Sequence, residues 1–99
     1  MLQRRRLLTI ITEAAIEKRL LQDLEQLGAR GYTISEARGK GSRGERSGNW
    51  RDVANIRIEL IVSEPLAAQL FAHLQQHYYD HYAMVAFLQD VDILRPDKF

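Results

Sequence analysis

The chain has 99 residues, of which 45% are hydrophobic and 27% are charged, an ordinary composition for one globular domain with a single modest core. Its net charge of +1 at pH 7 argues against a protein that coats nucleic acid or an anionic membrane through overall charge. The absence of cysteine excludes disulfides, thiolate metal sites and cysteine nucleophiles, and no apolar run suits a secretory signal or a membrane span. We therefore expect a cytoplasmic protein whose one domain spans residues 1–99.

The first part of the chain predicts a strand, a helix and a second strand. Residues 7–11 are apolar and β-branched, which indicates a short buried strand. Thr12 is a candidate N-cap for the following helix, Glu13 would lie in its first turn, and Gly28 would end it. Residues 32–37 predict a second strand that runs into a glycine-rich stretch. The apolar face of the helix recurs at helical spacing and comprises Ile16, Leu20, Leu21, Leu24 and Leu27.

The second part predicts a strand, a helix and a last strand. Residues 55–62 alternate apolar with polar side chains until the end of the run, so one face of this strand should be buried. Ser63 can cap the next helix, and Pro65 fits its first turn. Residues 84–88 and 91–94 supply one long or broken strand. The apolar face of this second helix comprises Leu66, Leu70, Phe71, Leu74 and Tyr78.

The order of these elements predicts an α+β fold of the ferredoxin-like type, βαββαβ. Its four-stranded antiparallel sheet should carry both helices on one face. Isoleucine and leucine side chains of the strands at residues 7–11, 55–62 and 84–94 would point to the other face, which is too apolar for open water. A short sheet with two apolar faces is typical of a protein that associates with copies of itself.

Residues 38–48 form a basic, glycine-rich stretch that holds four of the six glycines, four basic side chains and one acid. Glycine lets a ligand approach the main chain closely, and lysine and arginine supply charge-assisted donors for phosphate or carboxylate. The stretch therefore favours an anion-binding loop with phosphate as its ligand. A solvated hairpin tip without a ligand is the alternative that composition leaves open.

Three further features each allow two interpretations. The histidines at positions 73, 77 and 81 have a spacing that can bind a transition metal. A polar helix flank whose last member lies past the helix end is the favoured interpretation, and we expect no metal site. Residues 4–6 (Arg-Arg-Arg) could meet an acidic partner or a membrane surface, or form a flexible, solvated terminus. Trp50 is a large apolar group in a polar loop, which suits a partner-docking anchor or packing on a neighbouring subunit.

In addition, the sequence resembles the PII-like family of trimeric signalling proteins. The resemblance is closest to the carbon-concentrating-mechanism branch, which includes the SbtB-type and carboxysome-associated PII-like proteins. The matching segments are residues 12–13 (Thr-Glu), 28–33 (Gly-Ala-Arg-Gly-Tyr-Thr), 39–43 (Gly-Lys-Gly-Ser-Arg), 46–47 (Arg-Ser), 54–57 (Ala-Asn-Ile-Arg), Tyr78 with Tyr82 and Ala83, and 91–96.

The resemblance implies a homotrimer that binds an adenine nucleotide in each cleft between neighbouring subunits. It identifies residues 39–54 approximately as the T-loop, which changes conformation with the bound nucleotide and engages or releases a partner. Asn55 would fix the base of this loop. The residues that would hold phosphate are Lys40, Gly41, Ser42, Arg43, Arg46 and Ser47, and those that would line the adenosine part are Thr33, Gly39, Phe87, Leu88 and Gln89.

Two departures from the family pattern narrow the range of ligands that we expect. Signalling PII proteins carry a second glycine-rich loop before the last strand, whereas residues 78–83 contain no glycine here. We therefore expect AMP, ADP or cyclic AMP rather than Mg-ATP or 2-oxoglutarate. The cysteine pair of some SbtB-type proteins is absent, and the basic tail that includes Arg95 and Lys98 is similar to the carboxysome-associated type, for which bicarbonate is an implied second ligand.

The leading hypothesis is thus a non-enzymatic sensor with no obligatory cofactor. Its partner would be a bicarbonate transporter or a carboxysome-associated protein, and a transporter would recruit it to the inner face of the membrane. Nucleic acid is not an expected partner, although an RNA-binding ferredoxin-like module is one alternative. A slow nucleotide hydrolase with Asp90, Asp92 or Glu36 near a phosphate is the other.

Overall fold

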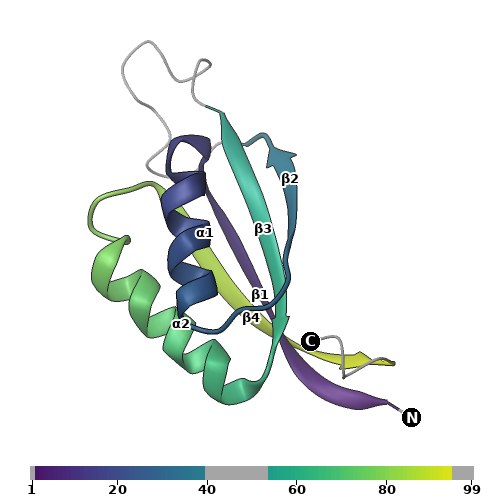
Figure 1. Cartoon of the computed structure of the whole chain (residues 1–99). Coiled ribbons are helices and arrows are strands. Elements are labelled where there is room, and N and C mark those ends of the chain that lie inside the picture. The colour runs from purple at the N-terminus through teal and green to yellow at the C-terminus, as the bar shows by residue number, and fades with distance from the viewer. Residues whose placement is uncertain (1, 40–53, 95–99) are drawn as a thin grey trace.

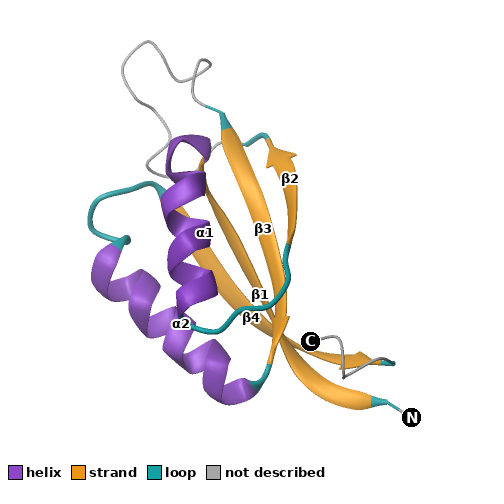
Figure 2. Cartoon of the chain, in the orientation of Figure 1, coloured by secondary structure: helices purple, strands orange, loops and turns teal. Residues whose placement is uncertain are grey.

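A computed structural model describes residues 2–39 and 54–94 of the chain. These residues form one antiparallel sheet of four strands in the order β2-β3-β1-β4, with both helices on the same face (Figures 1 and 2). The ferredoxin-like order βαββαβ predicted from the sequence is confirmed. The elements are β1 (Gln3–Glu13), the 3₁₀ helix η1 (Ala14–Ile16), α1 (Glu17–Gln26), β2 (Thr33–Ala37), β3 (Asn55–Val62), α2 (Glu64–His77) and β4 (Met84–Ile93).

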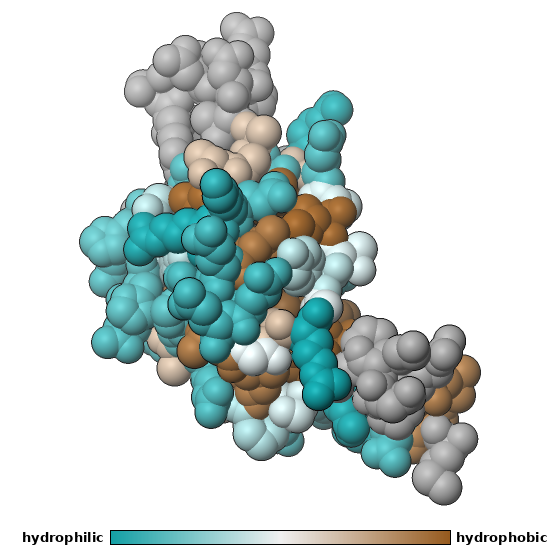
Figure 3. Space-filling view, in the orientation of Figure 1, coloured by the Kyte–Doolittle hydropathy of each residue, from teal (hydrophilic) through white to brown (hydrophobic). Residues whose placement is uncertain are grey.

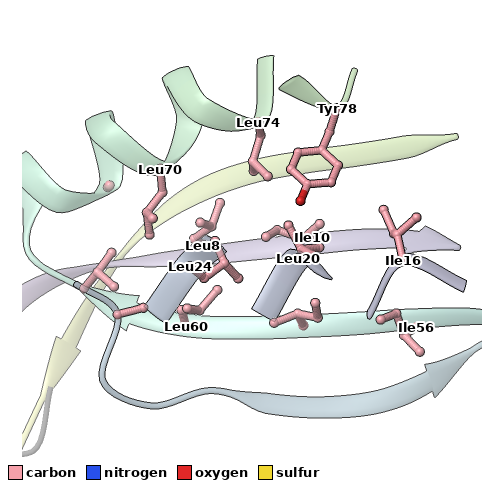
Figure 4. Packing of buried hydrophobic residues seen from close by; sticks show 14 residues of the cluster. Leu8, Ile10, Ile16, Leu20, Leu24, Ile56, Leu60, Leu70, Leu74 and Tyr78 are labelled. Carbon is pink, nitrogen blue, oxygen red and sulfur yellow. The ribbon is translucent and has the colours of Figure 1, made fainter. Parts of the chain in front are cut away.

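The core lies between the sheet and the helices. Strand β3 alternates as predicted, because its even-numbered residues are buried and its odd-numbered residues are partly exposed. Leu70 and Leu74 of α2 and the residue after it, Tyr78, lie in a row over Leu8 and Ile10 of β1 (Figure 4). The outer surface over the helices is mostly hydrophilic (Figure 3). Neither helix in the described part of the chain is long and apolar enough to span a membrane.

Two predicted helix ends are confirmed. Gly28 has a φ of 119°, and its N–H donates to Glu25 O while the N–H of Ala29 donates to Leu24 O. This is the Schellman arrangement, in which a residue with positive φ satisfies the last carbonyls of a helix. At the start of α2, the Ser63 hydroxyl accepts from the N–H of Leu66 at 3.4 Å. Local signals in the sequence were sufficient at both positions.

The predicted N-cap at Thr12 is wrong. Thr12 lies within β1, and the 3₁₀ helix that follows has no side-chain cap. The Thr12 hydroxyl instead donates at 2.9 Å to the carbonyl oxygen of Ala83, the residue that precedes β4. Glu13 is the last residue of β1 rather than part of a first helical turn. A long-range partner has therefore overridden the local capping preference.

The prediction that the first arginines form a flexible, solvated terminus is also wrong. Strand β1 begins at Gln3, so the arginines at positions 4–6 are part of the sheet. Arg4 Nε donates to Asp92 Oδ1 at 2.8 Å, and Arg6 Nη1 donates to Asp90 Oδ1 at 2.6 Å. These cross-strand pairs join β1 to β4 near the end of β3 and beyond it, where the two strands form a ribbon of their own (Figure 1).

The face of the sheet away from the helices is apolar along β1 and β4, although on β4 valine and phenylalanine form it rather than the expected isoleucine or leucine, since Leu88 packs against the core. The strand register places Leu7, Ile11, Ile61, Val85 and Phe87 on this open face. Val85 and Phe87 keep exposed fractions of 49% and 37%, which are large for apolar side chains within a strand. A sheet face of this kind is typically covered by another protein surface.

Candidate functional site

A pocket of about 760 Å³ lies where the segment 40–53 leaves and rejoins the sheet. Its walls come from the end of β2, the start of β3 and the turn of η1 and α1 beside them. A space of this size is within the range of small-molecule sites. The lining residues are Ala14, Glu17, Ile34, Ser35, Glu36, Ala37, Arg38, Gly39, Ala54, Asn55 and Ile56.

The lining combines apolar and charged side chains. Ile34 and Ile56 supply apolar surface, while Glu17, Glu36 and Arg38 contribute two carboxylates and one guanidinium. A Cβ atom added at Gly39 would meet nothing within 4 Å, so there is open space beside this backbone. A ligand can therefore approach the main chain here and receive hydrogen bonds from both charged and uncharged groups.

Two of the residues predicted to bind nucleotide, Gly39 and Asn55, meet at this pocket. Thr33 does not, because it is the first residue of β2 and lies opposite Glu59, at the other end of the strand. The predicted phosphate-binding residues Lys40, Gly41, Ser42, Arg43, Arg46 and Ser47 and the predicted docking residue Trp50 lie outside the described residues.

The predicted residues of β4 lie at the opposite edge of the sheet. The strand order places β2 and β4 at the two edges, with β3 and β1 between them. Phe87 and Gln89 alternate onto the open face, whereas the Leu88 side chain packs against the core. The Leu88 side chain thus lies on the face of the sheet opposite to Phe87 and Gln89. A single chain does not bring β4 and the pocket together.

Nine residues of the pocket lining were not predicted to bind nucleotide, and they include Ala14 and all three charged residues. Ala14 and Glu17 lie far from the glycine-rich stretch in the sequence, whereas Arg38 is its first residue and Glu36 lies just before it. Their convergence follows from the antiparallel pairing of β1 with β3, which puts Glu13 opposite Asn55 and so brings the start of η1 to the base of the loop segment. Pairing the predicted strands by their apolar faces could have found Ala14 and Glu17, whereas the basic stretch itself already pointed to Arg38.

A second polar cluster, outside the pocket lining, joins the two helices. Tyr78 is fully buried, and its hydroxyl donates to Asp23 Oδ2 at 2.6 Å; His73 Nε2 lies 3.0 Å from the same oxygen. Arg19 lies over the Tyr78 ring at 5.3 Å from its centre. The cluster ties α1 to α2, so these polar groups have a structural role within the fold.

The pKa values of this cluster follow from burial and hydrogen bonding. Burial raises the pKa of the Tyr78 phenol, and its hydrogen bond to Asp23 raises it further. Burial by itself raises the pKa of Asp23, but the hydrogen bonds from Tyr78 and His73 and the charge of Arg19 outweigh it, so the pKa lies below the ordinary 3.8. Asp23 is thus an ionised acceptor at neutral pH.

The histidine spacing does not assemble a metal centre in the described part of the chain. His73 is engaged with Asp23, and its ring centre lies 4.5 Å from that of His77, while His81 packs edge-on against Tyr82. Among residues 2–39 and 54–94, no group of three or more histidine, aspartate or glutamate side chains could hold a metal ion. The polar-flank interpretation accounts for these contacts.

Together these features define a ferredoxin-like domain with a long glycine-rich insertion between two neighbouring strands and a pocket at the base of that insertion. The family model described as nitrogen regulatory protein P-II matches residues 5–98. The chain therefore belongs to the P-II family.

Solved structures similar to this chain include PII-like proteins from two bacteria. A PII-like signalling protein from Thermus thermophilus is 46% identical, with 99% of this chain and 97% of that chain covered and a TM-score of 0.84. CPII from Thiomonas intermedia, bound to ADP and bicarbonate, is 34% identical, with 100% of this chain and 97% of that chain covered and a TM-score of 0.86. The same protein bound to ADP, AMP and acetate gives 32% identity, coverage of 100% and 97%, and a TM-score of 0.87.

Proposed function

We propose that this protein is a PII-like regulatory sensor that binds AMP or ADP in clefts between the subunits of a homotrimer. Bicarbonate is its second ligand. The T-loop, approximately residues 39–54, responds to the bound ligand and engages a partner in the uptake or fixation of inorganic carbon. This partner is a bicarbonate transporter, which would recruit the sensor from the cytoplasm to the inner membrane face, or a carboxysome-associated protein.

The observation that carries the proposal is the separation of the predicted site residues. Gly39 and Asn55 line the pocket near β2, whereas Phe87 and Gln89 lie on β4 at the far edge of the same sheet. Residues that serve one ligand from opposite edges of a sheet can meet only if a second copy supplies one of the two sets. The exposed apolar face along β1 and β4 is the surface that such an association would cover.

The choice of ligand is supported by the relatives and by the chain itself. CPII, which is 34% identical over the whole chain, binds ADP and bicarbonate in one structure, and ADP with AMP in another. Two carboxylates, Glu17 and Glu36, line the pocket. Their repulsion grows with the negative charge of the ligand, and Arg38 is the one basic side chain in the described lining, which agrees with AMP or ADP in preference to ATP.

The described residues do not favour an RNA-binding sheet, and they leave one of the three carboxylates considered for a hydrolase. An RNA-binding sheet stacks bases on paired aromatic residues, whereas the four described strands contain only Phe87. A hydrolase would need a carboxylate free to activate water. Asp90 and Asp92 are held in ion pairs with Arg6 and Arg4, so neither is placed for that role. Glu36 lines the pocket, so the hydrolase alternative depends on this carboxylate.

The test is calorimetry with AMP, ADP, ATP and cyclic AMP, each with and without bicarbonate. Two charge-assisted phosphate contacts of about 1.5–3 kcal/mol each predict that R43A/R46A weakens AMP binding by roughly a hundredfold or more. The matched control is K18A/R30A, which removes two exposed basic side chains outside the loop. Equal affinity of both double variants and the wild type would contradict the phosphate assignment.

The backbone contact at the pocket has its own test. Gly39→Ala should leave the fold intact, because the new Cβ meets nothing within 4 Å. It should nevertheless weaken AMP binding if the ligand lies against this backbone. Gly31→Ala, which also meets nothing within 4 Å but lies outside the pocket, is the control. Sedimentation of the wild type, with a mass three times that of the chain expected, tests the trimer independently.

A further inference from the structure

Thr12, Glu13 and Ala14, at the end of β1 and the start of η1, form hydrogen bonds with the residues that precede β4 and β3. On one side, the Thr12 hydroxyl donates to Ala83 O at 2.9 Å, and the N–H of Ala83 donates to Glu13 Oε2 at 2.9 Å. On the other side, the N–H of Ala14 donates to Ala54 O at 2.8 Å. Ala83 directly precedes β4, and Ala54 directly precedes β3, where the loop segment 40–53 rejoins the sheet.

The contacts at Ala83 leave this residue little freedom. Both polar groups of its backbone are used, each by a side chain of β1 rather than by a neighbouring strand. Thr12 is 1% exposed, so its hydroxyl cannot form a hydrogen bond with bulk water in place of the one to Ala83. A hydrogen bond to a carboxylate is stronger than one between neutral groups. The start of β4 is therefore positioned by Thr12 and Glu13.

The contacts at Ala54 connect the same junction to the pocket. Glu13 lies opposite Asn55 in the pairing of β1 with β3. Ala14, Ala54 and Asn55 all line the pocket. A shift of β1 at Thr12 and Glu13 must therefore move the start of β4 and the wall of the pocket together, because the same short stretch of backbone is bonded to both.

We infer that Thr12 and Glu13 are positioning residues that couple the pocket at the base of the T-loop to the start of β4. The inference rests on the proposed function for its consequence. If each cleft takes the pocket of one subunit and β4 of another, the two ends of this junction belong to two different clefts. A ligand in one cleft then changes the geometry of the neighbouring cleft through Thr12, Glu13 and Ala14 of the same subunit.

The coupling can be measured without any ligand, by hydrogen exchange at the amides of Ala83 and Ala14. Thr12→Val keeps the shape of the side chain but removes the donor to Ala83 O. We expect protection factors at both amides to fall by about tenfold, whereas those of core amides such as Leu20 stay unchanged. Thr12→Ser restores the hydroxyl and should restore both values. A loss confined to Ala83 in Thr12→Val, with Ala14 fully protected, would overturn the inference.

The functional consequence is measured with AMP as the probe. Glu13→Met keeps the length of the side chain without an acceptor, and Glu13→Gln keeps an acceptor oxygen. We expect Glu13→Met and Thr12→Val to weaken AMP binding by about tenfold, with Glu13→Gln and Thr12→Ser close to the wild type. Wild-type affinity in Glu13→Met and Thr12→Val would overturn the coupling. If the wild type itself binds no AMP, the proposed function fails, while the exchange experiment still decides whether the two ends move together.

Discussion

Removing the Tyr78 hydroxyl is the sharpest perturbation of the helix pair. The hydroxyl donates to an ionised acceptor, Asp23 Oδ2, at 2.6 Å, and the tyrosine is fully buried. A hydrogen bond to a charged group contributes about 1.5–3 kcal/mol to stability. Tyr78→Phe leaves the ring in place and so opens no large cavity. We expect the free energy of unfolding to fall by about 2 kcal/mol, which corresponds to a drop in Tm of about 10 °C for a domain of this size.

The same variant should change the pH dependence of stability in a defined way. The pKa of Asp23 lies below its ordinary 3.8 in the fold, so the stability it contributes is present above that value and is lost as the pH falls below it. The pKa of Tyr78 is raised above its ordinary 10.0, so its contribution is present below pH 10 and is lost as the pH rises further. The difference between wild type and Tyr78→Phe should therefore be constant near neutral pH and narrow at both extremes.

The assay is thermal and urea unfolding at one fixed protein concentration, since association makes Tm depend on concentration. Tyr82→Phe is the matched control, because the Tyr82 hydroxyl meets Arg19 at 3.3 Å in an exposed position. The control should change stability by less than about 0.5 kcal/mol. Equal losses of unfolding free energy in Tyr78→Phe and Tyr82→Phe would refute the reasoning. So would a stability difference between Tyr78→Phe and the wild type that stays constant between about pH 3 and about pH 11.

Three further variants test separate features. Gly28→Ala forces a Cβ onto a backbone with φ of 119° and should cost about 1–2 kcal/mol in urea unfolding, whereas Gly31→Ala, which has no positive φ, should change stability by less than about 0.5 kcal/mol. Arg6→Met removes the hydrogen bond that chiefly lowers the pKa of Asp90, so that pKa, followed by NMR titration, should return toward its ordinary range; an unchanged titration would contradict the pairing. Phe87→Asp places a charge on the open face and should shift sedimentation to a smaller species. Tyr32→Ser, at a site of similar exposure away from that face, should leave the sedimenting mass unchanged. A wild-type mass for Phe87→Asp would show that this face is not the interface.

Features governed by local periodicity could be predicted from the sequence. The alternation of residues 55–62 predicted both the strand and its buried face, and Gly28 predicted the end of the first helix. These predictions succeeded because the deciding interactions lie within a few residues of one another. The ferredoxin-like fold was then predicted from the order of strands and helices alone.

Features governed by distant partners could not be predicted in this way. Thr12 and Glu13 have the pattern of a helix start. Their actual role, hydrogen bonding to both backbone groups of Ala83, depends on a residue far along the chain. The arginines at positions 4–6 look unsuited to a strand until Asp90 and Asp92 are placed opposite them. In the site, Gly39 and Asn55 were expected from the family resemblance, but Glu17 and Glu36 reach the pocket through strand pairing.

The order of the strands has a consequence for the geometry of assembly. Because β2 and β4 lie at opposite edges, a contact between the pocket edge of one copy and the β4 edge of another joins two different surfaces. Such a contact is heterologous: repeated with a fixed rotation it closes into a ring, and without closure it continues as a filament. A closed ring holds as many clefts as chains. The number of nucleotides bound per chain at saturation therefore distinguishes the two assemblies. A ring binds one nucleotide per chain, whereas an open chain of copies binds fewer than one.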